Sequence, residues 1–165
     1  MTEKVEYKVV DNFLKEEDFK SIQNSIFSGD FPWHITQGVS YIGSGDGYYF
    51  SHLIYSRNAP SSRWFDILFP VFFKIEPIAI HRIKVNFHPT TQTLIKHSSH
   101  IDLKESHKGA ILYLNTNDGK TILNDGTEID SIENRMLFFD PSIPHRSTSC
   151  TNDPIGRFNI NFNYF

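Results

Sequence analysis

The sequence predicts a single α+β domain, mainly β, in which helices near the N-terminus precede sheets arranged as a sandwich or barrel. Two apolar stripes with helical spacing lie in the first half of the chain. From Ile78 onward, short apolar segments alternate with turn signals such as Asn117-Asp118-Gly119. The chain has 165 residues, 39% of them hydrophobic, and contains no internal repeat or linker. We therefore expect one packed domain over residues 1–165.

The two predicted helices differ in regularity. In Lys15–Phe27, apolar residues recur every three or four positions and form one stripe: Phe19, Ile22, Ile26 and Phe27. The second segment, Ser62–Lys74, has a similar pattern: Trp64, Ile67, Leu68, Val71 and Phe72. Because Pro70 interrupts this segment, we expect either a kink or two short helices. Both tryptophans, Trp33 and Trp64, are interpreted as core residues.

The second half of the chain predicts a series of short strands. The candidates are Ala79–Phe87, Ser99–Leu103, Gly109–Asn115, Thr121–Leu123, Thr127–Ile132, Met136–Phe139 and Arg157–Phe165. In the last of these, side chains alternate with a period of two. One face is apolar, and the other carries Arg157, Asn159, Asn161 and Asn163. Such a polar face either meets solvent or, in a small barrel, lines a ligand cavity.

Composition excludes several classes of protein. The net charge is −3 and the basic residues are scattered, which argues against general nucleic-acid binding. No apolar run approaches the ~20 residues that span a bilayer, and the start MTEKVEYK lacks the apolar segment of a signal peptide. Cys150 is the only cysteine, so no internal disulfide or thiolate metal cluster forms. We expect a cytoplasmic protein without membrane contact.

A candidate metal site begins at His100-Ile101-Asp102. Residues i and i+2 of a strand project to the same side, so both side chains can bind one ion. The pair alone is not diagnostic in a chain with eight histidines. A third ligand is available at His145, at the end of the loop-like Asp140–His145. Two imidazoles and one carboxylate suit non-haem Fe(II), with positions left open for a co-substrate and O2.

Arg157 follows His145 by twelve residues. Its planar guanidinium suits a dicarboxylate co-substrate, because it binds a carboxylate through two parallel hydrogen bonds and stays charged when enclosed. Arg146 competes for this role, but next to His145 in an extended chain it would face away from the metal. His97 offers an alternative His-x-x-His zinc pair with His100, although odd spacing on a strand sends the two rings to opposite faces.

The chain contains an H-x-D motif, a histidine about forty residues later and an arginine about ten residues after that. This order resembles the Fe(II)/2-oxoglutarate-dependent dioxygenases. Within them the chain looks like the prolyl-4-hydroxylase-like branch, including short versions found in phages and bacteria. The phrases ILYLN, ENRMLFFD and RFNINFNY match as well. The resemblance covers Ile80–Phe165, and Val10–Phe27 matches the family's opening strand and helix more loosely.

The resemblance implies a double-stranded β-helix (jelly-roll or cupin-like) core with the N-terminal helices packed on one sheet. It implies that His100, Asp102 and His145 bind Fe(II) and that Arg157 binds the distal carboxylate of 2-oxoglutarate. Four further residues are carried over as co-substrate neighbours or supports of the site: Tyr113, Asn161, Asn86 and His88. Relatives often have tyrosine near the position of His88, so the hydrogen bond made there is in doubt.

The implied activity is hydroxylation of a substrate by O2 and 2-oxoglutarate, with ascorbate as a supporting reductant. The substrate is a prolyl residue in a peptide, another side chain, a free amino acid, a nucleobase or another small molecule, and the sequence does not decide between them. The location is the host cytoplasm if a phage encodes the chain. Two alternatives stay open: a redox-inactive cupin-like metal enzyme and a non-catalytic binding module. The sequence gives no oligomeric state.

The segment Gly38–Tyr49 contains four glycines and is predicted to be a mobile loop or hairpin. Its apolar and aromatic residues Tyr41, Ile42, Tyr48 and Tyr49 suit a lid that closes over a bound substrate. The alternative is an ordinary surface hairpin.

Overall fold

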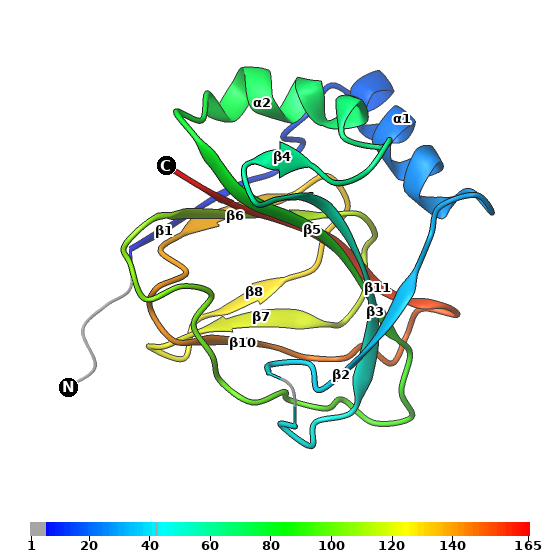
Figure 1. Cartoon of the computed structure of the whole chain (residues 1–165). Coiled ribbons are helices and arrows are strands. Elements are labelled where there is room, and N and C mark those ends of the chain that lie inside the picture. The colour runs from blue at the N-terminus through cyan, green and yellow to red at the C-terminus, as the bar shows by residue number, and fades with distance from the viewer. Residues whose placement is uncertain (1–5, 42) are drawn as a thin grey trace.

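Two antiparallel sheets face each other, and helices cover the outer face of the larger one (Figure 1). The structure is a computed structural model that describes residues 6–41 and 43–165, so Ile42 lies outside the described residues. The larger sheet has the order β1-β9-β6-β11-β5-β3-β2, with β4 paired to β3. Its strands are β1 (Tyr7–Val10), β2 (His34–Gln37), β3 (Tyr48–Ser56), β4 (Ala59–Pro60), β5 (Ile80–Pro89), β6 (Lys108–Tyr113), β9 (Met136–Phe139) and β11 (Gly156–Tyr164).

The smaller sheet has the order β10-β7-β8. Its strands are β7 (Lys120–Leu123), β8 (Glu128–Asp130) and β10 (His145–Ser147). Apolar side chains of both sheets meet between them, among them Ile111, Leu123 and Ile129. The two facing sheets form the predicted double-stranded β-helix core.

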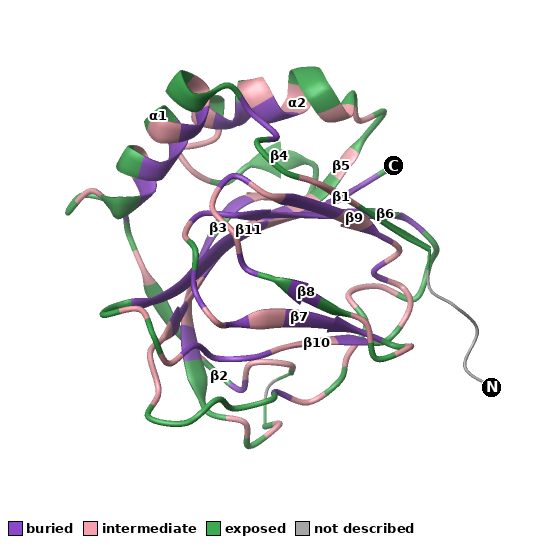
Figure 2. Cartoon of the chain, turned by 180° about the vertical axis from the view of Figure 1, so that it is seen from behind, coloured by how far each residue is buried: buried purple, intermediate pink, exposed green. Residues whose placement is uncertain are grey.

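The helices agree with the sequence pattern. Helix α1 (Glu16–Phe27) begins one residue after the predicted start and buries Phe19, Ile22, Gln23 and Ile26. The second segment is divided, as Pro70 suggested, into a 3₁₀ turn (η1, Asp66–Leu68) and α2 (Phe69–Ile75). Pro70 lies in the first turn of α2, where its missing N–H costs no helical hydrogen bond. The main core lies between these helices and the larger sheet, whose central strands β6 and β11 are largely buried in Figure 2.

Most of the predicted strands are present, but Ser99–Leu103 is not a strand. Only an isolated bridge joins His100 to His145 there. The region predicted as Thr127–Ile132 shortens to β8, and His145, expected in a loop, begins β10. Strands β2, β3, β4 and β10 were not predicted, since their sequences lack the period-two apolar pattern of β11, and β1 was expected only through the loose resemblance of Val10–Phe27. No helix among the described residues has the length and apolar character needed to cross a membrane.

Strand β11 separates the core from the space between the sheets. It pairs with β5 on one side and β6 on the other. Its apolar face joins the core beneath the helices through Phe158, Ile160, Phe162 and Tyr164. Its opposite, polar face is also buried, because the smaller sheet covers it. This face therefore lines a cavity, which was one of the two possibilities that the sequence left open.

Candidate metal centre and anion pocket

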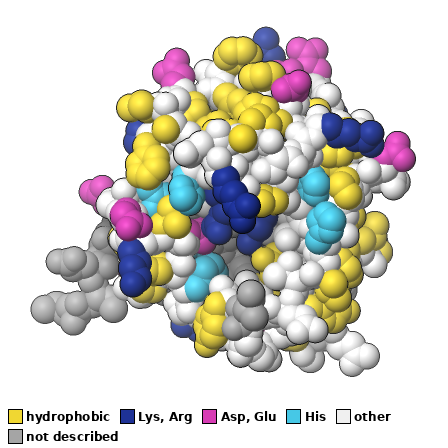
Figure 3. Space-filling model, in the orientation of Figure 1, with side chains coloured by type: hydrophobic (Ala, Val, Ile, Leu, Met, Phe, Trp, Pro, Cys, Tyr) yellow, Lys and Arg dark blue, Asp and Glu magenta, His cyan; other side chains and the backbone are white. Residues whose placement is uncertain are grey.

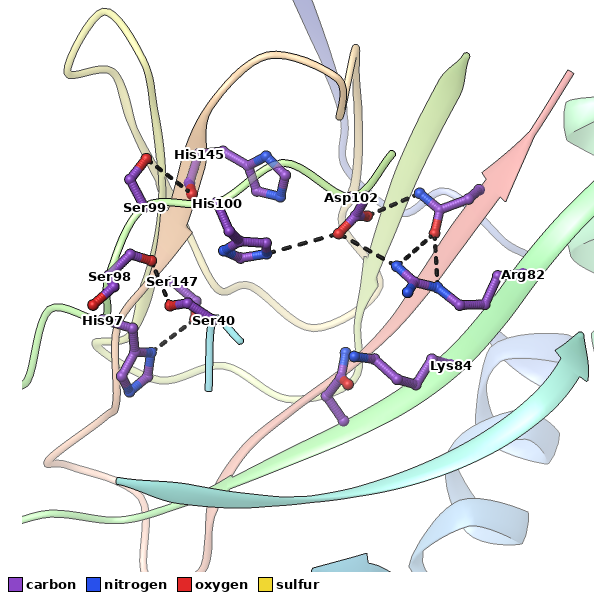
Figure 4. A network of polar contacts seen from close by, with 12 residues as sticks. Ser40, Arg82, Lys84, His97, Ser98, Ser99, His100, Asp102, His145 and Ser147 are labelled. Atoms are coloured by element: carbon purple, nitrogen blue, oxygen red, sulfur yellow. Dashed lines mark hydrogen bonds and ion pairs between the residues drawn. The ribbon is translucent and has the colours of Figure 1, made fainter. Parts of the chain in front are cut away.

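The three predicted metal ligands lie together. One ligand atom from each of His100, Asp102 and His145 lies within 4.8 Å of the other two. The backbones of His100 and His145 exchange two hydrogen bonds of 2.9 Å, and the Asp102 N–H donates to the Pro141 carbonyl at 2.9 Å. The His100 segment thus lies along the free edge of β10. The three side chains point toward one another in Figure 4.

Neighbouring groups keep Asp102 ionised. Its side chain is only 8% exposed, and Arg82 Nη2 lies 3.3 Å from Oδ1. The Asn163 amide donates to Oδ2 at 2.9 Å. Burial alone would raise the pKa of the Asp102 carboxyl, but Arg82, His145 and Asn163 together hold that pKa below its ordinary value. The carboxylate is therefore ready to bind a cation.

Both imidazoles suit metal binding. Burial lowers the pKa of His100 to about 4, and the charge of His145 adds to this effect, so His100 is neutral near pH 7. The His145 Nδ1 atom lies 3.0 Å from the carbonyl oxygen of Ile143. A proton on Nδ1 donates to that oxygen and leaves the Nε2 lone pair for a metal, an arrangement typical of metal-binding histidines. The donor set therefore fits a divalent cation such as Fe(II).

Arg157 is a buried cation at the start of β11, with 1% of its surface exposed. Its Nε donates to Ser131 Oγ at 2.7 Å and its Nη2 to Thr121 Oγ1 at 3.0 Å. Its Nη1 is buried and has no hydrogen-bond partner. Within the described part of the chain, no carboxylate forms an ion pair with it. A buried charge without a counterion is costly, so this guanidinium is well suited to bind an anionic ligand.

One cavity connects the metal ligands to Arg157. Side chains from β5, β7, β10 and β11 line it: Lys84, Asn86, His88, Thr121, His145, Arg146, Ser147, Arg157, Asn159 and Asn161, together with His100 and Asp102. The Asn86 amide donates to Asn159 Oδ1 at 3.0 Å. The buried side-chain oxygens of Asn86 and Asn161 lack partners, as does His88 Nδ1. Polar atoms are therefore available to a ligand between the metal ligands and Arg157.

The other predicted site residues occupy distinct places. Asn161, Asn86 and His88 line the cavity, whereas Tyr113 lies behind it. The Tyr113 hydroxyl donates to Thr121 Oγ1 at 2.8 Å, and the guanidinium of Arg157 lies 5.5 Å from the Tyr113 ring. Tyr113 thus supports Thr121 and Arg157 from behind. Its predicted hydrogen bond to a co-substrate stays a prediction.

The structure also places the two residues that competed for these roles, His97 for the metal and Arg146 for the co-substrate carboxylate. His97 is absent from the three-residue metal group and lies beside Ser147, 2.8 Å from its Oγ (Figure 4). Arg146 was expected to face away from the metal. It borders the cavity and also a second depression beyond β10, next to Lys96 and Asn124. Because Arg146 lies on the edge of the cavity, it is only partly buried, unlike Arg157.

The glycine-rich segment lies on the metal side of the molecule. Asp46 accepts hydrogen bonds from the N–H groups of Val39 at 2.8 Å and Ser98 at 2.9 Å, which joins the loop to the segment before His100. Tyr48 and Tyr49 belong to β3 rather than to the loop. Tyr49 is buried and stacks on His88 at 5.2 Å, while Tyr41 and Tyr48 are 59% and 54% exposed.

The sequence assigned no site role to several residues in or beside the cavity. Lys84 and Thr121 line it, and Arg82 and Ser131 contact Asp102 and Arg157, respectively. Arg82 and Lys84 share the period-two face of β5 with Asn86 and His88, which is a signal that the sequence contains. Thr121 and Ser131 reach Arg157 only because the smaller sheet folds over β11. Their role depends on contacts between distant segments and has no local signature.

Comparison with known proteins clarifies the fold. No protein-family model matches the chain, and no curated protein matches it in sequence. Solved structures do match. A prolyl-4-hydroxylase from Pseudomonas putida has a TM-score of 0.63 and 10% identity, over 97% of this chain and 92% of that one. The chain has the fold of the prolyl hydroxylases.

Two further structures agree. A prolyl hydroxylase from Trichoplax adhaerens, in complex with a peptide fragment of the hypoxia inducible factor oxygen degradation domain, has a TM-score of 0.66 and 15% identity, covering 96% of this chain and 83% of that one. A 2OG-Fe(II) oxygenase family protein from Burkholderia pseudomallei has a TM-score of 0.62 and 10% identity, covering 90% and 77%. These structural matches confirm the fold that the sequence resemblance implied. At 10–15% identity they show the fold alone, so the function is argued from the side chains that line the cavity.

Proposed function

We propose that this protein is an Fe(II)- and 2-oxoglutarate-dependent oxygenase that hydroxylates its substrate. The observation that carries the proposal is the buried, uncompensated Arg157 in the same cavity as the His100–Asp102–His145 group. A metal site alone fits many metal enzymes. A metal site joined to a buried guanidinium fits a ligand that binds the metal at one end and presents a carboxylate at the other. 2-Oxoglutarate is such a ligand.

Different residues of the cavity would bind the metal and the co-substrate. His100, Asp102 and His145 would hold the metal, and Arg157 would receive the distal carboxylate through its free Nη1. Thr121 and Ser131 fix the guanidinium in place. When bound, Fe(II) supplies the activation of O2 and the oxidative decarboxylation of 2-oxoglutarate. The enclosing sheets keep water away from the reacting groups.

The overall reaction balances as follows. One oxygen atom of O2 enters succinate, which forms from 2-oxoglutarate with loss of CO2. The other converts a C–H bond of the substrate to C–OH. Two of the similar structures are named prolyl hydroxylases, and one holds a peptide fragment, which supports a prolyl residue in a peptide as the first substrate to test. Free amino acids and other small molecules are the next candidates.

The test is turnover of 2-oxoglutarate labelled with 13C at its distal carboxyl (C5), which stays in the product, with Fe(II), O2 and ascorbate, followed by NMR detection of labelled succinate. Proline-containing peptides and free amino acids are supplied as substrates. We expect succinate formation that rises with the correct substrate and disappears in Asp102→Ala. A protein that binds one metal ion but never forms succinate, with or without substrate, would instead support a redox-inactive metal enzyme or a binding module.

A further inference from the structure

A second cation in the cavity lacks a counterion. Lys84 lies on β5, on the same face as Arg82, Asn86 and His88. Its Nζ donates to the Tyr49 hydroxyl at 2.9 Å and lies 5.2 Å from the Tyr49 ring centroid. No carboxylate of the described residues forms an ion pair with Lys84. Arg82, by contrast, is engaged by Asp102 and Asn163.

Lys84 and Arg157 occupy different ends of the cavity. In the pairing of β5 with β11, Lys84 lies opposite Asn161, whereas His88 lies opposite Arg157. Four residues of an antiparallel strand extend on the order of 13 Å. Arg82, the next residue of this face beyond Lys84, contacts the metal ligand Asp102. Lys84 therefore lies at the metal end, well separated along the strand from the guanidinium assigned to 2-oxoglutarate.

Lys84 also lies where the cavity meets the surface. A second depression, which does not include Arg157, is lined by Lys84, His100 and Asp102 together with the loop residues Gly38, Val39, Ser40 and Tyr41. Figure 4 shows Lys84 and Arg82 reaching from one strand toward the space beside His100 and Asp102. In the space-filling view, basic and histidine side chains gather around a hollow on this face (Figure 3). A molecule entering beside the metal ligands meets Lys84.

We infer that the substrate carries an anionic group, a carboxylate or a phosphate, which binds Lys84 beside the metal. This inference rests on the proposed function and names the chemical class of its substrate. The ammonium group supplies a charged donor, and the Tyr49 hydroxyl, which accepts from it, keeps it oriented toward the cavity. A 2-oxoglutarate carboxylate held at Arg157 leaves Lys84 free for this second anion.

The experiment uses Mn(II) in place of Fe(II), at less than one equivalent, with saturating 2-oxoglutarate. Paramagnetic broadening of probe proton signals reports which small molecules approach the metal. Two matched pairs serve as probes: N-acetylglycine with N-acetylglycinamide, and glucose 6-phosphate with glucose. We expect the anionic member of at least one pair to be broadened at roughly tenfold lower concentration, as for a charge-assisted hydrogen bond. The responding pair distinguishes carboxylate from phosphate.

Three variants identify the responsible side chain. Lys84→Met should abolish the preference for the anionic probe, and Lys84→Arg should retain it. Lys96→Met is the matched control, since Lys96 is 60% exposed and pairs with Glu128 at 3.7 Å. Equal broadening by charged and neutral probes, or an anion preference that survives in Lys84→Met, would overturn the inference. So would an anionic probe that displaces 2-oxoglutarate.

A titration of 2-oxoglutarate in the same samples separates the two proposals. If the parent protein binds Mn(II) and 2-oxoglutarate but shows no anion preference, only the inference about Lys84 fails. If 2-oxoglutarate does not bind at all, the proposed function fails. If Lys84→Met weakens 2-oxoglutarate binding as much as loss of Arg157, Lys84 belongs to the co-substrate site and the inference is overturned.

Discussion

Arg157 is the residue whose surroundings most clearly require a ligand. Fixed by Thr121 and Ser131, it is held in one orientation with an unused donor. Gly119 makes room for it, because a Cβ at that position would lie 2.5 Å from Arg157 Cδ. The fold therefore keeps a charged, rigid group at the end of a polar cavity. This is the preorganisation that selective carboxylate binding needs.

Replacement of Arg157 tests this assignment. Loss of one partner of an enclosed charged pair typically costs about 2–5 kcal/mol. Arg157→Ala should therefore raise the 2-oxoglutarate concentration required for binding by well over tenfold, as measured by calorimetry on the metal-loaded protein. Arg146→Ala, the matched control on β10, should change it little. The opposite ranking would move the role to Arg146.

Asp102 is the only anionic ligand in the proposed metal group. Asp102→Ala should weaken Fe(II) binding by more than roughly 100-fold, since loss of even an outer partner of a metal ligand typically costs 10–100-fold. Competition with a chromogenic chelator under anaerobic conditions measures the affinity. Asp30→Ala, at an exposed carboxylate, is the control. Unchanged iron affinity in the Asp102 variant would remove this residue from the site.

The sequence predicted that His100, Asp102, His145 and Arg157 lie in one place, because their residue types and spacing are characteristic, and all four line one cavity. Their roles as metal ligands and anion-binding residue stay predictions. Lys84 and Ser131 could not be placed there from the sequence, for different reasons. In the sequence, Lys84 looks like any other strand residue. Only the register of β5 against β11 places it at the end of the cavity near the proposed metal ligands. Ser131 follows β8 and reaches Arg157 only through the packing of the smaller sheet.

At the scale of elements, β11 was the best predicted part of the fold. Its strict alternation separates the core from the cavity. The apolar face joins the core, and the polar face lines the cavity, which was one of the two possibilities that the pattern left open. The Ser99–Leu103 segment was predicted wrongly as a strand. Its backbone makes hydrogen bonds at His100 and Asp102 but no continuous ladder. Isolated backbone hydrogen bonds are enough to orient the side chains of His100 and Asp102, and the local sequence gives no sign of such contacts.

The loop before β3 gives a prediction at this scale. It is joined to Ser98 through Asp46, next to the metal segment rather than on the far side of the barrel. We expect amides of residues 38–47 to exchange faster than those of the Ile78–Phe165 strands without substrate, as measured by hydrogen exchange. Deletion of residues 43–45 should impair substrate turnover while Fe(II) and 2-oxoglutarate binding stay nearly intact. Unchanged turnover would make the loop an ordinary surface hairpin.

The whole molecule buries several neutral histidines around the cavity, which links its stability to pH. Burial lowers the pKa of His97 to about 4, while its unfolded value is about 6.5. The unfolded state therefore binds the proton more readily between these values. The stability that His97 contributes is present above pH 6.5 and is lost as pH falls toward 4. A shift of this size corresponds to roughly 3 kcal/mol.

Urea unfolding of the metal-free protein at several pH values measures this linkage. The parent protein should lose stability from pH 6.5 to 4. His97→Phe, which keeps a ring beside His88, should show a flatter profile, and His81→Gln, at an exposed histidine, should follow the parent. A profile in the His97 variant as steep as that of the parent would show that His97 does not contribute.

In the proposed function, one cavity holds a metal ion at one end and the 2-oxoglutarate carboxylate at the other. A crystal structure of the protein grown with Mn(II) and 2-oxoglutarate tests it most directly. We expect one metal ion bound by His100, Asp102 and His145, with the distal carboxylate of 2-oxoglutarate paired to Arg157. A metal ion bound elsewhere, or a carboxylate paired to Arg146 while Arg157 stays without an anion, would contradict the assignment.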